Sequence, residues 1–142
     1  MAGCTFFGHR ECYQLDIAVL REAIEKLIRQ GVDEFLVGHQ GQFDRMVYSC
    51  LRSLKKQFPH IRYNVVLAQL PTHKEDIPDS CYPEGMESVP PKYAIDRRNR
   101  YLVEAADICL CYIDYSWGGA YKFACMAKRR GLTVINLGGL SL

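Results

Sequence analysis

Short strand-like segments alternate with amphipathic helical segments along most of this chain. The strand-like segments are rich in apolar residues and cover residues 4–8, 33–39, 63–70, 107–114 and 132–137. The helical segments repeat apolar residues at helical spacing and cover residues 13–31, 43–59, 92–106 and 118–131. Strands that alternate with helices pair in parallel through right-handed crossovers. The alternation therefore predicts an α/β chain with a mainly parallel, five-stranded sheet and helices on both of its faces.

The chain has 142 residues, the size of one domain, so residues 1–142 are expected to form a single unit. Residues 71–91 interrupt the alternation. They hold five of the six prolines together with Tyr82, and they have no hydrophobic period. Loops of this length in a compact domain are usually functional or mobile, so a long loop or lid is predicted here.

Composition excludes several classes of partner. The net charge is only +2, so direct binding of nucleic acid or of an anionic membrane is not expected. No apolar run approaches the roughly 20 residues that cross a bilayer, and the first residues lack the pattern of a signal peptide. We therefore expect a cytoplasmic protein. The seven cysteines include no CxxC pair and have no ligand spacing with the histidines, so free thiols are expected, without a metal or cofactor.

The first strand-like segment ends in a glycine, a histidine and an arginine, at residues 8–10. Ligands of parallel sheets bind outside the carboxyl ends of the strands. Gly8 permits a sharp exit from the strand and a close approach of a ligand to the backbone. Arg10 is suited to bind a phosphate through two parallel hydrogen bonds. The alternative interpretation is that His9 caps a helix and Arg10 is a solvated surface charge.

The second strand-like segment ends in GHQGQFD, residues 38–44. Gly38 and Gly41 flank the turn around Gln40, and the next helix is predicted to begin near Phe43 and Asp44. A helix start behind small residues offers free N–H groups and a positive dipole to an anion. Asp44 is either an ordinary helix cap or an acceptor for a ribose or a base.

The segment DYSWGGAYK, residues 114–122, repeats this arrangement before the last helix. Gly118 and Gly119 predict a second phosphate cradle, although two glycines also permit close helix–strand packing. Three aromatic side chains offer stacking faces for a base: Tyr115, Trp117 and Tyr121.

The helical segment before the fourth strand contains three arginines within DRRNR, residues 96–100. Arg97 and Arg98 are adjacent on the helix and so face different directions. One of them is expected to project to the strand ends while another arginine is solvated. The chain has no HExxH, no evident Ser-His-Asp order, no carboxylate pair, and neither glycine-rich nucleotide fingerprint. The residues are those of a site that binds anions and polar rings, with few general acids or bases.

Four motifs in order, TFFGHR, VGHQGQFD, AIDRRNRYLVEAAD and GGAYKFACMAKRRGLTVINL, resemble the SLOG superfamily, the Rossmann-like group named for the Smf/DprA and LOG proteins. The resemblance covers nearly the whole chain, with residues 71–91 matched least. It is nearest to the small single-domain bacterial and phage branch. It implies a doubly wound, Rossmann-like fold and a nucleotide-type ligand at the glycine-rich turns.

The LOG enzymes of this superfamily cleave the base from a nucleoside monophosphate. Arg98 precedes Asp107 by nine residues, which is similar to the spacing of the LOG arginine and aspartate. Asn99 stands at the LOG lysine, Gly119 and Ala120 stand at a Gly-Thr pair, and Phe123 stands at the catalytic glutamate. Phenylalanine can neither activate water nor stabilise an oxocarbenium ion. Hydrolysis then needs a carboxylate from elsewhere, for which the candidates are Asp44, Glu84 and Asp114.

Three functions follow from these observations. The first is binding of a nucleotide-derived small molecule, such as an ADP-ribose-like compound or a cyclic nucleotide signal, by a sensor or a sequestering protein. The resemblance adds a role in phage–host conflict to this expectation. The second is LOG-like hydrolysis of an N-glycosidic bond, and the third is a protein-interaction module without a ligand. A homo-oligomer is expected in each case.

Overall fold

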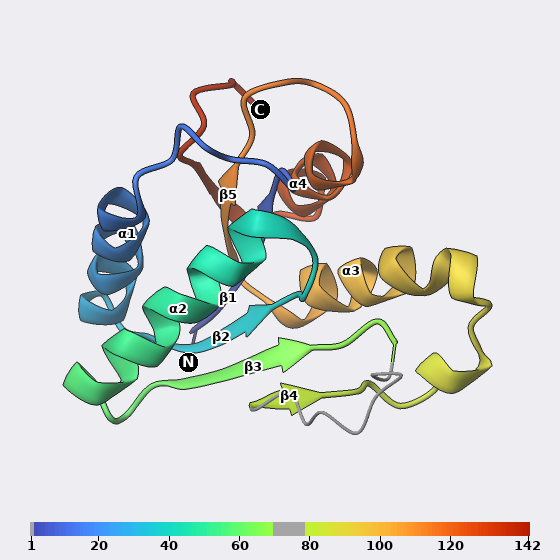
Figure 1. Ribbon diagram of the computed structural model, residues 1–142, viewed down its shortest axis with the longest axis horizontal. Coiled ribbons are helices and arrows are strands. Elements are labelled where there is room, and N and C mark those ends of the chain that lie inside the picture. The colour runs from blue at the N-terminus through green and yellow to red at the C-terminus, as the bar shows by residue number, and fades with distance from the viewer. Residues whose placement is uncertain (1, 70–78) are drawn as a thin grey trace.

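Parallel strands form one sheet at the centre of the protein (Figure 1). The computed structural model describes residues 2–69 and 79–142, and within them the sheet has six strands in the order β4-β3-β2-β1-β5-β6. The strands are β1 (Ala2–Gly8), β2 (Val32–Val37), β3 (Arg62–Val66), β4 (Ser80–Cys81), β5 (Ile108–Tyr112) and β6 (Thr133–Asn136). All neighbouring pairs are parallel. The predicted α/β class and the helix-covered parallel sheet are confirmed.

The sixth strand corrects the predicted count of five. β4 lies inside the segment predicted as a loop and pairs with β3 through Val65 opposite Ser80 and Val66 opposite Cys81. Two residues are too few to show the alternation by which a strand is recognised in sequence. The described part of that segment also contains the short 3-10 helix η1 (Met86–Ser88), and a second one, η2 (Pro91–Tyr93), begins at its last residue. Residues 71–78 of the predicted lid lie outside the described residues.

Four α-helices of the described chain cover the sheet: α1 (Ile17–Arg29), α2 (Gly41–Gln57), α3 (Ala94–Ala105) and α4 (Gly119–Arg129). α1 begins later than predicted because Asp16 caps it, with its side chain accepting a hydrogen bond of 2.9 Å from the Ala18 N–H. Leu20, Ile24, Leu27 and Ile28 are buried against the sheet, whereas Ile17 and Val19 of the same helix are exposed.

Each strand divides its side chains between two cores, as a period of two requires. In β1, Phe6 packs with α1 and α2, whereas Phe7 packs with α3 and α4. Phe35 and Leu36 divide in the same way in β2. Burial of such a side chain stabilises the fold by about 1.5–3 kcal/mol. The doubly wound, Rossmann-like arrangement follows, with α1 and α2 on one face and α3 and α4 on the other.

The strand order reverses between β1 and β5. The chain runs outward from β1 through β2, β3 and β4, returns over the other face in α3, and enters β5 on the opposite side of β1. The carboxyl ends of β1 and β5 therefore lie side by side, followed by loops that diverge. Such a crevice is where ligands of doubly wound sheets bind. No helix in the described ranges is both long and apolar enough to span a membrane.

Candidate functional site

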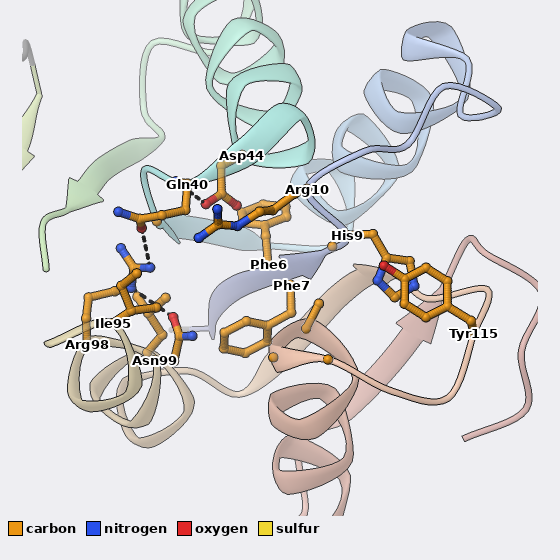
Figure 2. A pocket seen from close by; sticks show the side chains of 16 residues that line it. Phe6, Phe7, His9, Arg10, Gln40, Asp44, Ile95, Arg98, Asn99 and Tyr115 are labelled. Atoms are coloured by element: carbon orange, nitrogen blue, oxygen red, sulfur yellow. Dashed lines mark hydrogen bonds between the residues drawn. The ribbon is translucent and has the colours of Figure 1, made fainter. Parts of the chain in front are cut away.

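A cavity of about 320 Å³ opens at this reversal of strand order (Figure 2). Its walls come from the end of β1, the turn between β2 and α2, the helix α3, and the segment between β5 and α4. This volume falls within the range of small-molecule sites, roughly 300–1,000 Å³. We call it the switch-point cavity.

Nearly all of the residues predicted as ligand-binding line this cavity. They are Gly8, His9, Arg10, Gly38, Gln40, Asp44, Arg98, Asn99, Tyr115, Gly118, Gly119 and Ala120. These residues come from four segments that are far apart in sequence. Topology brings them together because each segment follows the carboxyl end of a strand or, for Arg98 and Asn99, crosses over those ends on α3.

Phe43 does not line the cavity, although the sequence suggested it. Its ring is fully buried in the core shared with α1 and α2. A Cβ built on Gly8 would lie only 2.1 Å from Phe43 Cγ. Gly8 is therefore required for the packing of this ring, in addition to its place at the cavity.

Gly41 also lies beside the cavity rather than in its wall. Its φ is +86°, and a Cβ there would lie 2.7 Å from Arg10 Cα. The Gln42 N–H donates a hydrogen bond of 2.8 Å to the Arg10 carbonyl, and the Cys12 N–H donates one of 2.9 Å to Gln42 Oε1. These contacts hold the loop after β1 against the start of α2.

Arg98 is the largest fully buried side chain of the site, with 2% of its surface exposed. Its guanidinium donates to three acceptors: Asn99 Oδ1 at 2.8 Å from Nε, the Val66 carbonyl at 3.0 Å from Nη1, and Gln40 Oε1 at 2.6 Å from Nη2. Burial lowers the pKa of Arg98, and the nearby Asp44 carboxylate opposes this shift. Arg98 therefore links α3, the end of β3 and the β2–α2 turn.

Asp44 is the buried acid of the site. One oxygen, Oδ2, accepts a hydrogen bond of 2.9 Å from the Gln40 N–H at the start of α2. Burial raises the pKa of Asp44 to about 6, against the opposing effects of that hydrogen bond and of the Arg98 charge. Both charged groups pack against Gly38, since a Cβ on it would lie 2.9 Å from Arg98 Cζ and from Asp44 Oδ2. A buried acid with a raised pKa in a cleft is a candidate for ligand binding or proton transfer.

His9 is buried, and its Nε2 accepts a hydrogen bond of 3.2 Å from the Asp114 N–H. An accepting Nε2 carries no proton, so the neutral ring has its proton on Nδ1. Burial lowers the pKa of His9, and the Asp114 carboxylate, 3.3 Å from Nε2, opposes this shift. His9 thus ties the end of β1 to the end of β5.

The aromatic residues after β5 form a stack with His9. Tyr115 lies on the His9 ring, with centroids 3.5 Å apart and planes at 8°, and Trp117 lies 4.1 Å from Tyr115. Two rings so close to one phenol occupy its opposite faces. Neither face of Tyr115 is left for a base, and the open aromatic surface belongs to Trp117, which is 65% exposed.

The start of α4 lies open to the cavity. Gly118 precedes the helix with φ of +91°, no side chain caps its first N–H groups, and Cβ atoms built on Gly118 or Gly119 meet nothing within 4 Å. Such a helix start attracts anions through its N–H groups and its dipole. The exposed Arg10 lines the same cavity (Figure 2), and its guanidinium has no hydrogen bond or ion pair with any described residue.

Four apolar lining residues were not predicted: Phe6, Phe7, Ile95 and Leu102. Sequence patterns assign such side chains to the core, and three of them are indeed largely buried. Ile95 lies four residues before Asn99 and Leu102 three residues after it, so all three share one face of the helix. From this spacing their position in the cavity lining could have been predicted.

Only one of the carboxylates proposed to replace the LOG glutamate lines the cavity. Phe123 is buried against Phe7, with ring centroids 5.8 Å apart. Glu84 lines a different depression beside η1, and Asp114 lies behind His9 outside the lining. Asp44 remains. Within residues 2–69 and 79–142, no cluster of His, Cys, Asp or Glu side chains is suited to hold a metal ion.

No protein-family model matches the chain, and a search of curated proteins finds no match.

Proposed function

We propose that the switch-point cavity binds a nucleotide-derived small molecule with its phosphate at the start of α4. The observation that supports this most directly is the uncapped helix start behind Gly118 and Gly119, open toward a cavity of about 320 Å³. Backbone N–H groups and the helix dipole bind phosphate without a charged side chain. Arg10, whose guanidinium has no partner among the described residues, then adds a bidentate contact.

The resemblance to the SLOG superfamily supports the same class of ligand. On this proposal the protein is a sensor or a sequestering protein for a nucleotide signal, which includes ADP-ribose-like compounds and cyclic nucleotides. A sequestering role in phage–host conflict rests on the resemblance alone.

Native mass spectrometry and a thermal-shift screen test the proposal. The screen uses nucleoside monophosphates, NAD, ADP-ribose and cyclic nucleotides. A ligand at 100 times its Kd adds about 2.7 kcal/mol to stability, which is a rise in Tm of roughly 5–10 °C for a chain of this size. The mass spectrum reports whether a ligand is retained intact, and the subunit number tests the expected homo-oligomer.

A pair of arginine variants separates specific binding from net charge. Arg10→Met keeps the methylene groups that pack near Gly41 but removes the charge. Arg45→Met removes the same charge from an exposed residue of α2 that does not line the cavity. We expect Arg10→Met to weaken nucleotide binding about tenfold or more, because hydrogen bonds to a charged group contribute about 1.5–3 kcal/mol. Equal effects of the two variants, or no shift with any compound in the wild type, would contradict the proposal.

LOG-like hydrolysis is a second candidate because Asp44 lies in the cavity with a pKa raised to about 6. Water would replace the base at the anomeric carbon, with Asp44 taking the proton from the water and the departing base taking a proton from solvent. A pKa near the working pH suits such a general base. Chromatography of a nucleoside monophosphate incubated with the protein tests this. Release of free base that is lost in Asp44→Asn supports hydrolysis, and a ligand recovered intact supports binding alone.

If no compound in the screen binds, the function as a protein-interaction module is favoured. Trp117, as an exposed aromatic residue, would then be the first candidate for a protein interface.

A further inference from the structure

Asn99 lines the switch-point cavity where apolar side chains adjoin the Arg98 guanidinium. It lies on α3 between Ile95 and Leu102, and Phe7, which packs with α3 and α4, lies beside it (Figure 2). Such a wall offers apolar surface to the faces of a planar ring, while Asn99 is positioned to meet a polar atom at its edge.

The orientation of the Asn99 amide is fixed by Arg98. A guanidinium only donates hydrogen bonds, so the amide must turn its oxygen toward Arg98 Nε, which lies 2.8 Å away. The NH₂ group is then directed away from Arg98, and in Figure 2 it lies on the side of Phe7 and the cavity. Asn99 consequently presents a donor to the ligand.

Arg98 has little freedom to turn toward a ligand itself. Its other hydrogen bonds go to the Val66 carbonyl and to Gln40 Oε1, and its side chain is 2% exposed. Gln40 is held in turn by its backbone N–H, which donates to Asp44. The chain of contacts from Asp44 to Asn99 spans the cavity from α2 to α3 and rigidifies the donor.

We propose that Asn99 reads a hydrogen-bond acceptor, a carbonyl oxygen or ring nitrogen, on the base of the ligand, and that Arg98 is a positioning residue that holds the Asn99 donor in place. The inference rests on the proposed function, since it places the base at α3 and the phosphate at the start of α4. A phosphate is disfavoured near Asn99 because Ile95, Leu102 and Phe7 are apolar and the neighbouring cation, Arg98, already has three acceptors.

Asn99→Asp tests the donor without removing the contact to Arg98. Aspartate has the same shape and still accepts from Arg98 Nε, but it replaces the NH₂ donor by an acceptor. Gln42→Glu is the matched control, because it makes the same chemical change at the start of α2, keeps an acceptor for the Cys12 N–H, and does not line the cavity. The probes are the ribonucleoside monophosphates and ribose phosphate, which has no base.

We expect Asn99→Asp to lower the affinity for the best-binding nucleoside monophosphate by about 10- to 100-fold. The aspartate would then present an acceptor to an acceptor on the base. Binding of ribose phosphate should change no more than it does in Gln42→Glu. An equal loss for ribose phosphate would place a sugar or phosphate oxygen at Asn99 and overturn the assignment. The assignment would also be overturned if Asn99→Asp lowered the affinity for the nucleoside monophosphate no more than Gln42→Glu does.

NMR of the protein without ligand tests the positioning role separately. The Arg98 Nε–H should exchange slowly with water, and Arg98→Lys should shift the Asn99 side-chain amide signals while Arg45→Lys leaves them unchanged. A rapidly exchanging Arg98 Nε–H, or amide signals insensitive to Arg98→Lys, would refute the positioning role. If these signals behave as expected but the wild type binds neither probe, the positioning role holds and the proposed function fails, together with the assignment of a base to Asn99.

Discussion

Gly8 provides the sharpest test of how the end of β1 is built. In Gly8→Ala the new methyl group would lie 2.1 Å from Phe43 Cγ and 2.3 Å from Cδ2. Carbon atoms in contact are about 3.5–4.0 Å apart, so the ring and the strand must separate by more than about 1 Å. Phe43 is fully buried and cannot move without displacing its neighbours. Overpacking of this kind costs typically 1–3 kcal/mol, and we expect a loss of about 3 kcal/mol in the free energy of unfolding.

Urea unfolding followed by circular dichroism measures this loss. Gly119→Ala is the control, because a Cβ on Gly119 meets nothing within 4 Å, and we expect it to change stability by less than about 0.5 kcal/mol. Phe43→Ala removes the two ring atoms of closest approach but keeps the Phe43 Cβ, which would lie 2.7 Å from the new methyl group. Gly8→Ala should therefore still destabilise the protein in that background, but less than in the wild type, with a coupling of about 2 kcal/mol between the two changes. Additive effects of Gly8→Ala and Phe43→Ala, or a Gly8→Ala protein as stable as Gly119→Ala, would refute the packing argument.

Three further predictions concern titratable groups. Burial raises the pKa of Asp44 from 3.8 to about 6, so the folded protein holds this proton more tightly than the unfolded chain, and stability from this group is lost as pH rises from about 4 to 6. Urea unfolding should show the wild type losing up to roughly 3 kcal/mol relative to Asp44→Asn over this interval, and parallel pH profiles would contradict it. Burial lowers the pKa of His9 below 6.5, so its contribution is present above 6.5 and is lost as pH falls through the lowered value. Nitrogen NMR at pH 7 should find its proton on Nδ1, and a proton on Nε2 would exclude the hydrogen bond from Asp114. All seven cysteines are free, but only Cys81 and Cys125 are partly exposed, so a thiol reagent should label these two first and the rest only after denaturation.

The fold was predictable because its determinants are local. Apolar residues recur at the period of a helix or a strand within each segment, and the alternation of segments leaves few topologies. The same rule places residues 8–10 and 114–120 at neighbouring strand ends, so most of the cavity lining could be predicted before any coordinates. β4 was missed because two residues of strand carry no period.

The directions of single side chains could not be predicted in this way. Phe43 lies among lining residues in sequence but is directed into the core, and Arg98 is buried although it belongs to a run of charged residues. Both outcomes depend on which partners lie across the fold: the Gly8 backbone for Phe43, and the acceptors Gln40 and Val66 for Arg98.

The sequence by itself determined the class of fold, the edge of the sheet at which the switch-point cavity opens, and the types of residue gathered there, since periodicity and strand order are properties of neighbouring residues. Only the tertiary structure decided that His9 and Trp117 cover both faces of Tyr115 and that Arg98 fixes the orientation of Asn99. The physical reason is that a stacked ring or a buried guanidinium is satisfied by groups distant in the chain, whose positions become defined only when the sheet is assembled.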